Sequence, residues 1–299
     1  MANADTAGLA RTRTRAAVAV GAGNFMEWFD FAVYGFFAVT LGALFFPSRD
    51  DAVSLLSSLA TFGVAFLVRP VYREISDRRA APVRRRAGAD PRAIALTFSF
   101  AGVQGLGFYY LATYVVTHLT RSVHLEGTRA LGLVAAGLTG YALLCPVAGA
   151  LSDRVGRRPL NVAGSLGLAV FALPAFLLMG TGRPGPILLG IALLAICQAM
   201  LSVTTVVMLA ELFPARTRGS GSAIGFNLGV TLIGGPGPFV AAALAEASGL
   251  AVMPAVYLAA VAFAGFLVVL RGLPETRGRG LGVAARAPWS RPEPEAGVS

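Results

Sequence analysis

Long apolar runs alternate with short polar turns along most of this chain. Eight of the runs are long enough to cross about 30 Å of hydrocarbon as helices. Gly, Pro and Ser stand in the turns between them, as in Pro47-Ser48 and Gly180-Thr181-Gly182. The pattern predicts an all-α, polytopic membrane protein with about eight transmembrane helices. The predicted spans are Ala16–Phe46, Ala52–Val68, Ile94–Val116, Ala130–Leu151, Leu160–Met179, Ile187–Ala210, Ser222–Ala245 and Leu250–Leu270.

Composition supports the same class of protein. Of the 299 residues, 56% are hydrophobic and only 13% are charged, whereas a soluble domain carries about 25% charged residues. No nucleotide-binding loop, metal-ligand set or nucleophile–base pair is visible in the sequence. We therefore expect no enzyme activity, no cofactor and no metal.

The basic residues are distributed unevenly between the two sides of the predicted membrane. All 25 are arginines, and with the N-terminus inside, 21 of them fall on the inner side. Such asymmetry follows the positive-inside rule and predicts a plasma-membrane protein with both termini in the cytosol. Because the arginines flank membrane spans in short loops, anionic lipid headgroups explain them better than nucleic acid does.

The N-terminus, cysteines and histidines add little chemistry. The first apolar run is too long for the core of a cleavable signal peptide, so none is expected. Cys145 and Cys197 fall inside predicted spans, where we expect packing and not a disulfide. His118 and His124 fall at an outer helix end and in the next loop, where solvated side chains are expected.

The first predicted span carries two carboxylates within an apolar stretch. Asn24, Glu27, Asp30 and Tyr34 fall within an arc of about 120° on a helix, so one face is polar. A charge inside a bilayer span costs about 3 kcal/mol or more, and such residues usually serve function. We predict that this face handles protons or substrate. The alternative is an interfacial helix end, or carboxylates that only pair with a neighbouring helix.

Other polar residues are candidates for the wall of a central cavity. They are Tyr110, Gln198 and Asn227, each inside a predicted span. Arg69, at the inner end of the second span, is a candidate partner for a substrate carboxylate. The alternative for Arg69 is a side chain that reaches the interface only to keep its charge in water.

Three further motifs fall on the predicted inner side. They are Gly149–Arg158, Glu211–Gly219 and Leu273–Arg279. We predict that they form one cluster, with at least one arginine of Arg154, Arg157 and Arg158 within salt-bridge distance of Glu211 or Glu275. The cluster is a candidate gate, and the alternative is simple positive-inside anchoring. Its predicted members are Asp153, Arg154, Arg157, Arg158, Glu211, Arg218, Glu275 and Arg277.

Together these motifs resemble the metabolite:proton symporter family of the major facilitator superfamily. The first-span motif is Gly23-Asn24-Phe25-Met26-Glu27-Trp28-Phe29-Asp30-Phe31, followed by Tyr34-Gly35-Phe36. The matching motifs further along are Phe108-Tyr109-Tyr110, Ser152–Pro159, Glu211–Pro214 with Phe226-Asn227, and Pro274–Gly278. The resemblance implies a major-facilitator-like bundle and proton-coupled symport of a small organic acid or zwitterionic metabolite, with Glu27 and Asp30 as proton carriers.

The number of spans departs from this resemblance. The superfamily has twelve helices in two halves of six, whereas this chain shows about eight, arranged as two and six. The resemblance therefore implies that helices 3–6 are missing here, so a membrane remnant that binds only lipid or a partner subunit is the competing hypothesis. The predicted divisions are 1–15 (basic N-terminus), 16–69 (two helices), 70–93 (Arg-rich loop), 94–272 (six-helix half) and 273–299 (disordered cytosolic tail).

Overall fold

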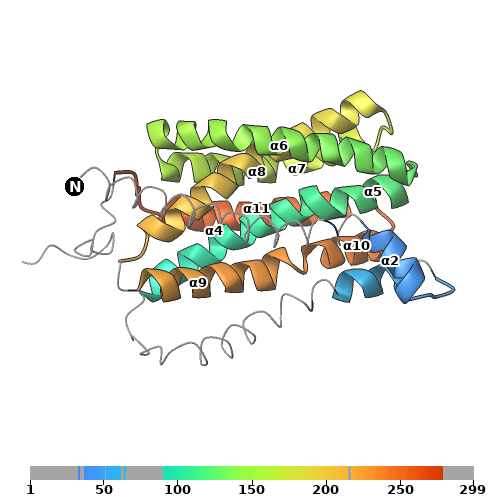
Figure 1. Cartoon of the computed structure of the whole chain (residues 1–299), viewed down its shortest axis with the longest axis horizontal. Helices are drawn as coiled ribbons and strands as arrows, with labels where there is room; N and C mark the ends of the chain where they lie inside the picture. The colour runs from blue at the N-terminus through green and yellow to red at the C-terminus, as the bar shows by residue number, and fades with distance from the viewer. Residues whose placement is uncertain are drawn as a thin grey trace, which may run out of the picture.

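The structure is a computed structural model that describes residues 33, 37–50, 52–61, 64, 90–214 and 217–278. Within these ranges the chain forms α-helices and two short π-helical segments, and no strand (Figure 1). The predicted all-α fold class is therefore confirmed. Asn24, Glu27, Asp30, Tyr34 and Arg69 lie outside the described residues, so the predicted proton- and substrate-handling face of the first span stays a prediction.

Six helical segments of the described part are long and apolar enough to span a membrane. Their bounds are Pro91–Arg121, Gly127–Val155, Arg157–Met179, Pro184–Glu211, Arg218–Ser248 and Met253–Gly272. Five of them contain the whole of one span predicted between Ile94 and Leu270. The sixth, Met253–Gly272, contains most of the predicted span Leu250–Leu270. The chain also forms two shorter helices, α2 (Ala38–Phe45) and Ala52–Thr61, inside the first two predicted spans.

The long segments divide into labelled elements where the helix changes type. In chain order these are α4 (Pro91–Tyr109), η1 (Tyr110–Tyr114), α5 (Val115–Arg121), α6 (Gly127–Val155), α7 (Arg157–Met179), α8 (Pro184–Glu211), α9 (Arg218–Gly229), η2 (Val230–Gly234), α10 (Gly237–Ser248) and α11 (Met253–Gly272). The break between α9 and α10 falls where the sequence places Gly234 to Pro238, since Pro236 has no N–H to continue the helix.

Capping chemistry extends α4 beyond its apolar run. Asp90 caps α4 by accepting a hydrogen bond from Arg92 N (2.8 Å), and Pro91 occupies the first helical position. Hydropathy alone starts this span at Ile94, because it treats Arg92 as a loop residue. α4 therefore begins at Pro91, before the apolar run that starts at Ile94.

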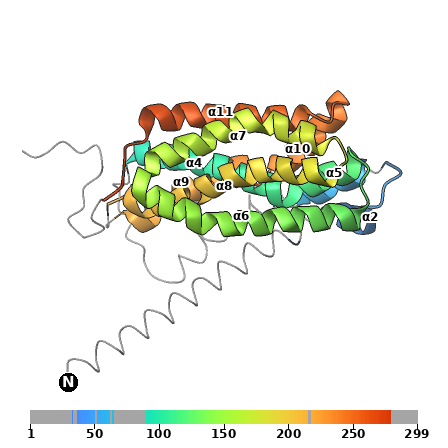
Figure 2. The ribbon, with the colours of Figure 1, turned by 90° about the horizontal axis from the view of Figure 1, so that it is seen from above.

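The span of α4 lies at the centre of the bundle. In Figure 1 it runs between α6 and α8 on one side and α9 and α10 on the other, and α4 packs against α8, α9, η2 and α11. α6 and α11 lie at opposite edges in Figure 2. α4 and η2 approach closely at Gly105 and Gly234, where a Cβ on Gly234 would lie 3.0 Å from the Gly105 carbonyl carbon.

Candidate functional site

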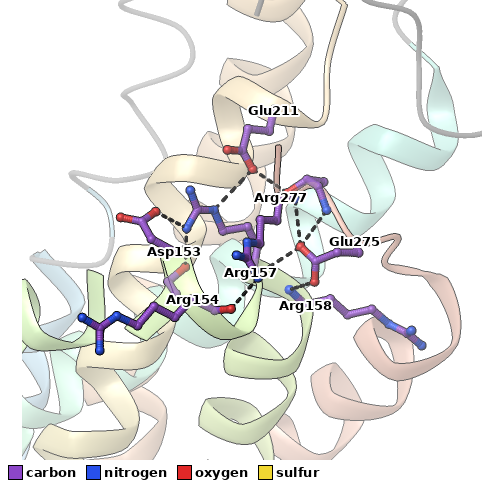
Figure 3. A network of polar contacts seen from close by, with 9 residues as sticks. Asp153, Arg154, Arg157, Arg158, Glu211, Glu275 and Arg277 are labelled. Carbon is purple, nitrogen blue, oxygen red and sulfur yellow. Dashed lines mark hydrogen bonds and ion pairs between the residues drawn. The ribbon is translucent and has the colours of Figure 1, made fainter. Parts of the chain in front are cut away.

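Charged residues from four elements meet at one end of the bundle, in what we call the arginine-rich cluster (Figure 3). They come from the end of α6, the start of α7, the end of α8 and the segment 273–278 after α11. The cluster comprises Asp153, Arg154, Arg157, Arg158, Glu211, Glu275, Thr276 and Arg277. The sequence predicted all of these but Thr276. The structure thus joins three motifs that lie far apart along the chain.

Arg157 is the central cation of the arginine-rich cluster. Its Nη1 lies 2.6 Å from Asp153 Oδ1, and its Nε lies 3.6 Å from Glu211 Oε2. The predicted contact between an arginine of this loop and Glu211 or Glu275 is therefore confirmed. The Arg157 and Glu211 side chains are 12% and 11% exposed, whereas Asp153 is 70% exposed. Of these two ion pairs, only Arg157–Glu211 has both of its side chains shielded from water.

Among the described residues, Glu275 contacts backbone N–H groups and no guanidinium. Its carboxylate accepts hydrogen bonds from the backbone N–H of Arg157 (2.9 Å), Arg158 (3.2 Å), Thr276 (2.9 Å) and Arg277 (2.9 Å). The first two donors are the opening residues of α7, so Glu275 caps that helix from a distant part of the chain. Burial by itself raises the pKa of Glu275, but these four donors hold the pKa below its ordinary value.

Gly156 makes room for this cap. Its φ is +114°, a conformation that L side chains rarely adopt, and a Cβ there would lie 2.5 Å from Glu275 Oε2. Both constraints require glycine between α6 and α7. The glycine in the motif Asp153-Arg154-Val155-Gly156-Arg157-Arg158 is thus explained by the approach of Glu275.

The segment after α11 is tied to three helices. The Thr276 hydroxyl donates to Glu211 Oε2 (2.6 Å), and Arg277 Nη1 donates to the Arg154 carbonyl oxygen. Arg158 Nη2 donates to the Leu270 carbonyl oxygen at the end of α11 (2.9 Å). Because Thr276 is fully buried, residues 273–278 pack against the bundle, although the sequence analysis assigned them to a tail. Arg218, the remaining predicted member, begins α9.

A second group of polar side chains, the central polar network, joins the middles of three helices. Gln198 Nε2 of α8 donates to the Gln104 carbonyl oxygen of α4 (2.8 Å) and to Ser202 Oγ (3.1 Å). Gln104 Nε2 (3.3 Å) and the Tyr141 hydroxyl of α6 (2.9 Å) also donate to Ser202 Oγ. Gln198 is fully buried, whereas Tyr141 and Ser202 are half-buried. The network therefore extends from the interior of the bundle towards a less covered side.

The other two predicted cavity residues of the described part make hydrogen bonds elsewhere. The buried Tyr110 hydroxyl donates to the Pro254 carbonyl oxygen at the start of α11 (2.9 Å). Asn227 is half-buried, and its Nδ2 donates to the Ala223 carbonyl oxygen of its own helix (2.6 Å). Of Tyr110, Gln198 and Asn227, only Gln198 belongs to the central polar network.

The expectation for His118 is wrong. The residue is 2% exposed and not solvated, because its ring lies among aromatic side chains, with its centroid 4.7 Å from that of Phe176. Neither ring nitrogen has a hydrogen-bond partner within the described part of the chain. Cys197 is buried and Cys145 half-buried, and both are free thiols.

Sequence reasoning missed Tyr141 and Ser202. Tyr141 falls in the middle of its span, too deep to be an interfacial anchor, and that position is a usable signal. Ser202 has no such signal, since a serine in a helix can hydrogen-bond its own backbone. Its role depends on three donors that only the packing of α4, α6 and α8 brings together.

Apolar helices of membrane-spanning length, with neutral polar groups at their centre and arginines at one end, define a multi-pass membrane protein. Residues 74–286 match the family described as sugar (and other) transporter. The chain belongs to this family of the major facilitator superfamily, whose members are transporters and not enzymes. The expected superfamily is therefore confirmed.

Curated relatives carry names that specify solutes. The proline/betaine transporter of Escherichia coli K12 is 25% identical over 410 aligned positions, covering 85% of this chain and 82% of the relative. The glycine betaine/proline/ectoine/pipecolic acid transporter of Dickeya dadantii is also 25% identical, covering 86% and 82%. The ectoine/proline transporter of Corynebacterium glutamicum is 33% identical, covering 50% of this chain and 30% of the relative.

The alignment with the Escherichia coli protein contains many positions that this chain lacks. Because 85% of 299 residues is about 254, about 156 of the 410 aligned positions have no residue in this chain. At about 1.5 Å of rise per residue, a helix needs about 20 residues to span the membrane. The unmatched positions are therefore more than four helices with short loops need. The absence of helices 3–6 stays a prediction.

Proposed function

We propose that this protein is a proton-coupled symporter of a small zwitterionic or organic-acid solute in the plasma membrane, with both termini in the cytosol. The observation that carries the proposal is the central polar network, because neutral donors and acceptors in the middle of three apolar helices have no role in lipid contact. In transporters of this superfamily the substrate site lies near the bilayer midplane.

The solute class is supported by what the relatives are named for. Proline, glycine betaine, ectoine and pipecolic acid all combine a carboxylate with a cationic nitrogen group, and these names recur among the relatives. Proton coupling is assigned to Glu27 and Asp30, which the sequence places in the first span. An intramembrane carboxylate that binds a proton in one state and releases it in another couples the two fluxes.

The arginine-rich cluster is assigned a structural role at the cytosolic end. Its contacts join the ends of α6, α8 and α11 to the start of α7, all within the six-helix half. Locking a gate requires contacts that form and break between two halves. We therefore assign the cluster to holding this half rigid, so that it moves as one body during transport.

Uptake by purified protein in liposomes tests the proposal. Radiolabelled proline or glycine betaine is supplied with an inward proton gradient, and again after the gradient is collapsed with a protonophore. We expect gradient-dependent uptake that Asp30→Asn reduces at least about tenfold, as removal of an essential proton carrier does. Empty liposomes are the control, and uptake equal to theirs under every condition contradicts the proposal.

The second candidate is a membrane remnant that does not transport, and the positions that this chain lacks support it. A chain without about 156 aligned positions of its relative is expected to lack the second bundle that alternating access needs. The remnant hypothesis then predicts no net uptake, and binding only of lipid or a partner subunit. Inserting the corresponding segment of a relative after residue 70 should restore uptake if the deficit is the cause.

A further inference from the structure

Three hydrogen-bond donors in the central polar network converge on one oxygen. Gln104 Nε2, Gln198 Nε2 and the Tyr141 hydroxyl lie 3.3, 3.1 and 2.9 Å from Ser202 Oγ. A serine oxygen has two lone pairs, so it satisfies two of the three donors. If Ser202 instead donates its own proton to Tyr141, the Tyr141 hydrogen is left over. One donor is therefore surplus in either arrangement.

Neighbouring acceptors do not absorb this surplus. Gln198 Oε1 lies against Gly107, where a Cβ would clash with it, so the α4 backbone closes it off. The Tyr141 hydroxyl also contacts the Cys145 thiol, but sulfur is a weak acceptor. Rotating the Gln104 amide only moves the surplus donor to its own NH2 group. The rotated position of the Gln104 NH2 group is buried and has no partner among the described residues. With the amide unrotated, the surplus donor lies among groups that include the half-buried Tyr141 and Ser202, on the less covered side of the network.

The six-helix half supplies no charge at this depth. Every acidic side chain of the described residues lies in a loop or within three residues of a helix end. These are Asp50, Asp90, Glu126, Asp153, Glu211, Glu246 and Glu275. The first predicted span, by contrast, carries Glu27 and Asp30. The surplus donor on the half-buried side of this neutral network fits an anionic group.

We propose that the hydroxyls of Ser202 and Tyr141, with the Gln104 amide, bind the carboxylate of the transported zwitterion. The assignment rests on the proposed function and names the end of the solute that this half recognises. It makes Arg69, the sequence-based candidate for the carboxylate, unnecessary for recognition.

Paired solutes test the assignment on the full-length chain in lipid nanodiscs. Glycine betaine and choline share a trimethylammonium group, and only glycine betaine has a carboxylate. We expect the wild-type chain to prefer glycine betaine in calorimetric titrations. Tyr141→Phe and Ser202→Ala should each weaken glycine betaine binding by about tenfold to a hundredfold, the loss typical of one hydrogen bond to a charged group, and should leave choline binding unchanged.

Matched variants separate this effect from misfolding. Tyr257→Phe removes a phenolic hydroxyl outside the network and should leave both affinities unchanged. Thr139→Val removes a hydroxyl of α6 that hydrogen-bonds its own helix backbone, and it should also leave both affinities unchanged. Gln104→Glu places a negative charge in the network and should reverse the preference, so that choline binds more tightly than glycine betaine. A misfolded protein cannot gain affinity for choline.

The outcomes distinguish the assignment from the function on which it rests. A wild-type chain that binds neither solute overturns both. A chain that prefers glycine betaine, with a preference unchanged in Tyr141→Phe, Ser202→Ala and Gln104→Glu, overturns the carboxylate assignment alone. If Arg69→Ala loses the preference and these three variants keep it, Arg69 and not the network binds the carboxylate.

Discussion

The arginine-rich cluster uses charged side chains at the ends of four elements, whereas the central polar network uses only neutral side chains in the middle of three helices. Water and lipid headgroups are available at a bundle end, so an exposed charge such as Asp153 is cheap there. At mid-span a charge costs several kcal/mol, so polar contacts are made by amides and hydroxyls. Position along the membrane normal thus decides which chemistry each region can use.

The two regions also differ in what fixes their geometry. In the cluster, Glu275 bonds backbone N–H groups across a glycine, so the contact depends on the path of the main chain. In the network, the contacts are mainly between side chains, with one bond to the Gln104 carbonyl oxygen. We therefore expect substitutions in the cluster to change stability, and substitutions in the network to change solute binding. Four predictions test the stability side of this comparison, three in the cluster and one at the buried His118, from the largest effect to the smallest.

Gly156→Ala should have the largest effect on stability. The substitution combines an unfavourable φ of +114° with a Cβ that displaces Glu275 from the start of α7, and such strain costs about 1–3 kcal/mol before the cap is lost. Thermal unfolding in detergent should show a marked fall in Tm. Gly132→Ala is the control, because nothing lies within 4 Å of its Cβ position in α6. Equal Tm values for the two variants contradict the role of Gly156.

Arg157 and Glu211 should be coupled more strongly than Arg157 and Asp153. A double-mutant cycle with Arg157→Met and Glu211→Gln should give a coupling of about 1–3 kcal/mol, since both side chains are shielded from water. The cycle with Asp153→Asn should give less than about 1 kcal/mol, because Asp153 is exposed. A larger coupling for Asp153 would show that the 2.6 Å contact, and not shielding, determines the energy.

Glu275→Gln should cost about 1 kcal/mol at neutral pH, as the loss of other helix caps does. The pKa of Glu275 is lower in the folded protein than its ordinary value of 4.5. The carboxylate therefore contributes fully above about pH 4.5, and its contribution is lost as the pH falls through the folded pKa. The difference in Tm between wild type and variant should be constant above that pH and narrow below it. A constant difference at all pH values argues that the amide caps the helix differently.

His118→Phe should have the smallest effect. Both nitrogens of the buried ring lack partners among the described residues, and burying an unpaired polar group costs free energy. Phenylalanine keeps the contact with Phe176 and removes the two nitrogens, so we expect Tm to stay within about 2 °C or to rise. Tyr110→Phe is the comparison, because it removes a hydroxyl that bonds Pro254 and should lower Tm. A clear fall for His118→Phe would indicate an unseen partner for the imidazole.

The sequence predicted the helical fold and most of the arginine-rich cluster. Hydropathy located all six spans of the described half, because a membrane-spanning helix must be apolar over its whole length. The motifs around Asp153, Glu211 and Glu275 fall at span ends on the same predicted side, so their meeting followed from topology. The central polar network was only partly predicted, since Gln198 was a candidate while Tyr141 and Ser202 were not.

By itself, the sequence determined the class of protein, the number of spans in the six-helix half and the likeness to transporters, because these depend on hydrophobicity and local motifs. The tertiary structure alone decided that Glu275 caps α7 through Gly156, that Thr276 is buried on Glu211, and that three donors converge on Ser202. These contacts join residues from different helices. Their geometry depends on how the helices rotate and pack, and no local pattern of hydrophobic and polar residues encodes that rotation.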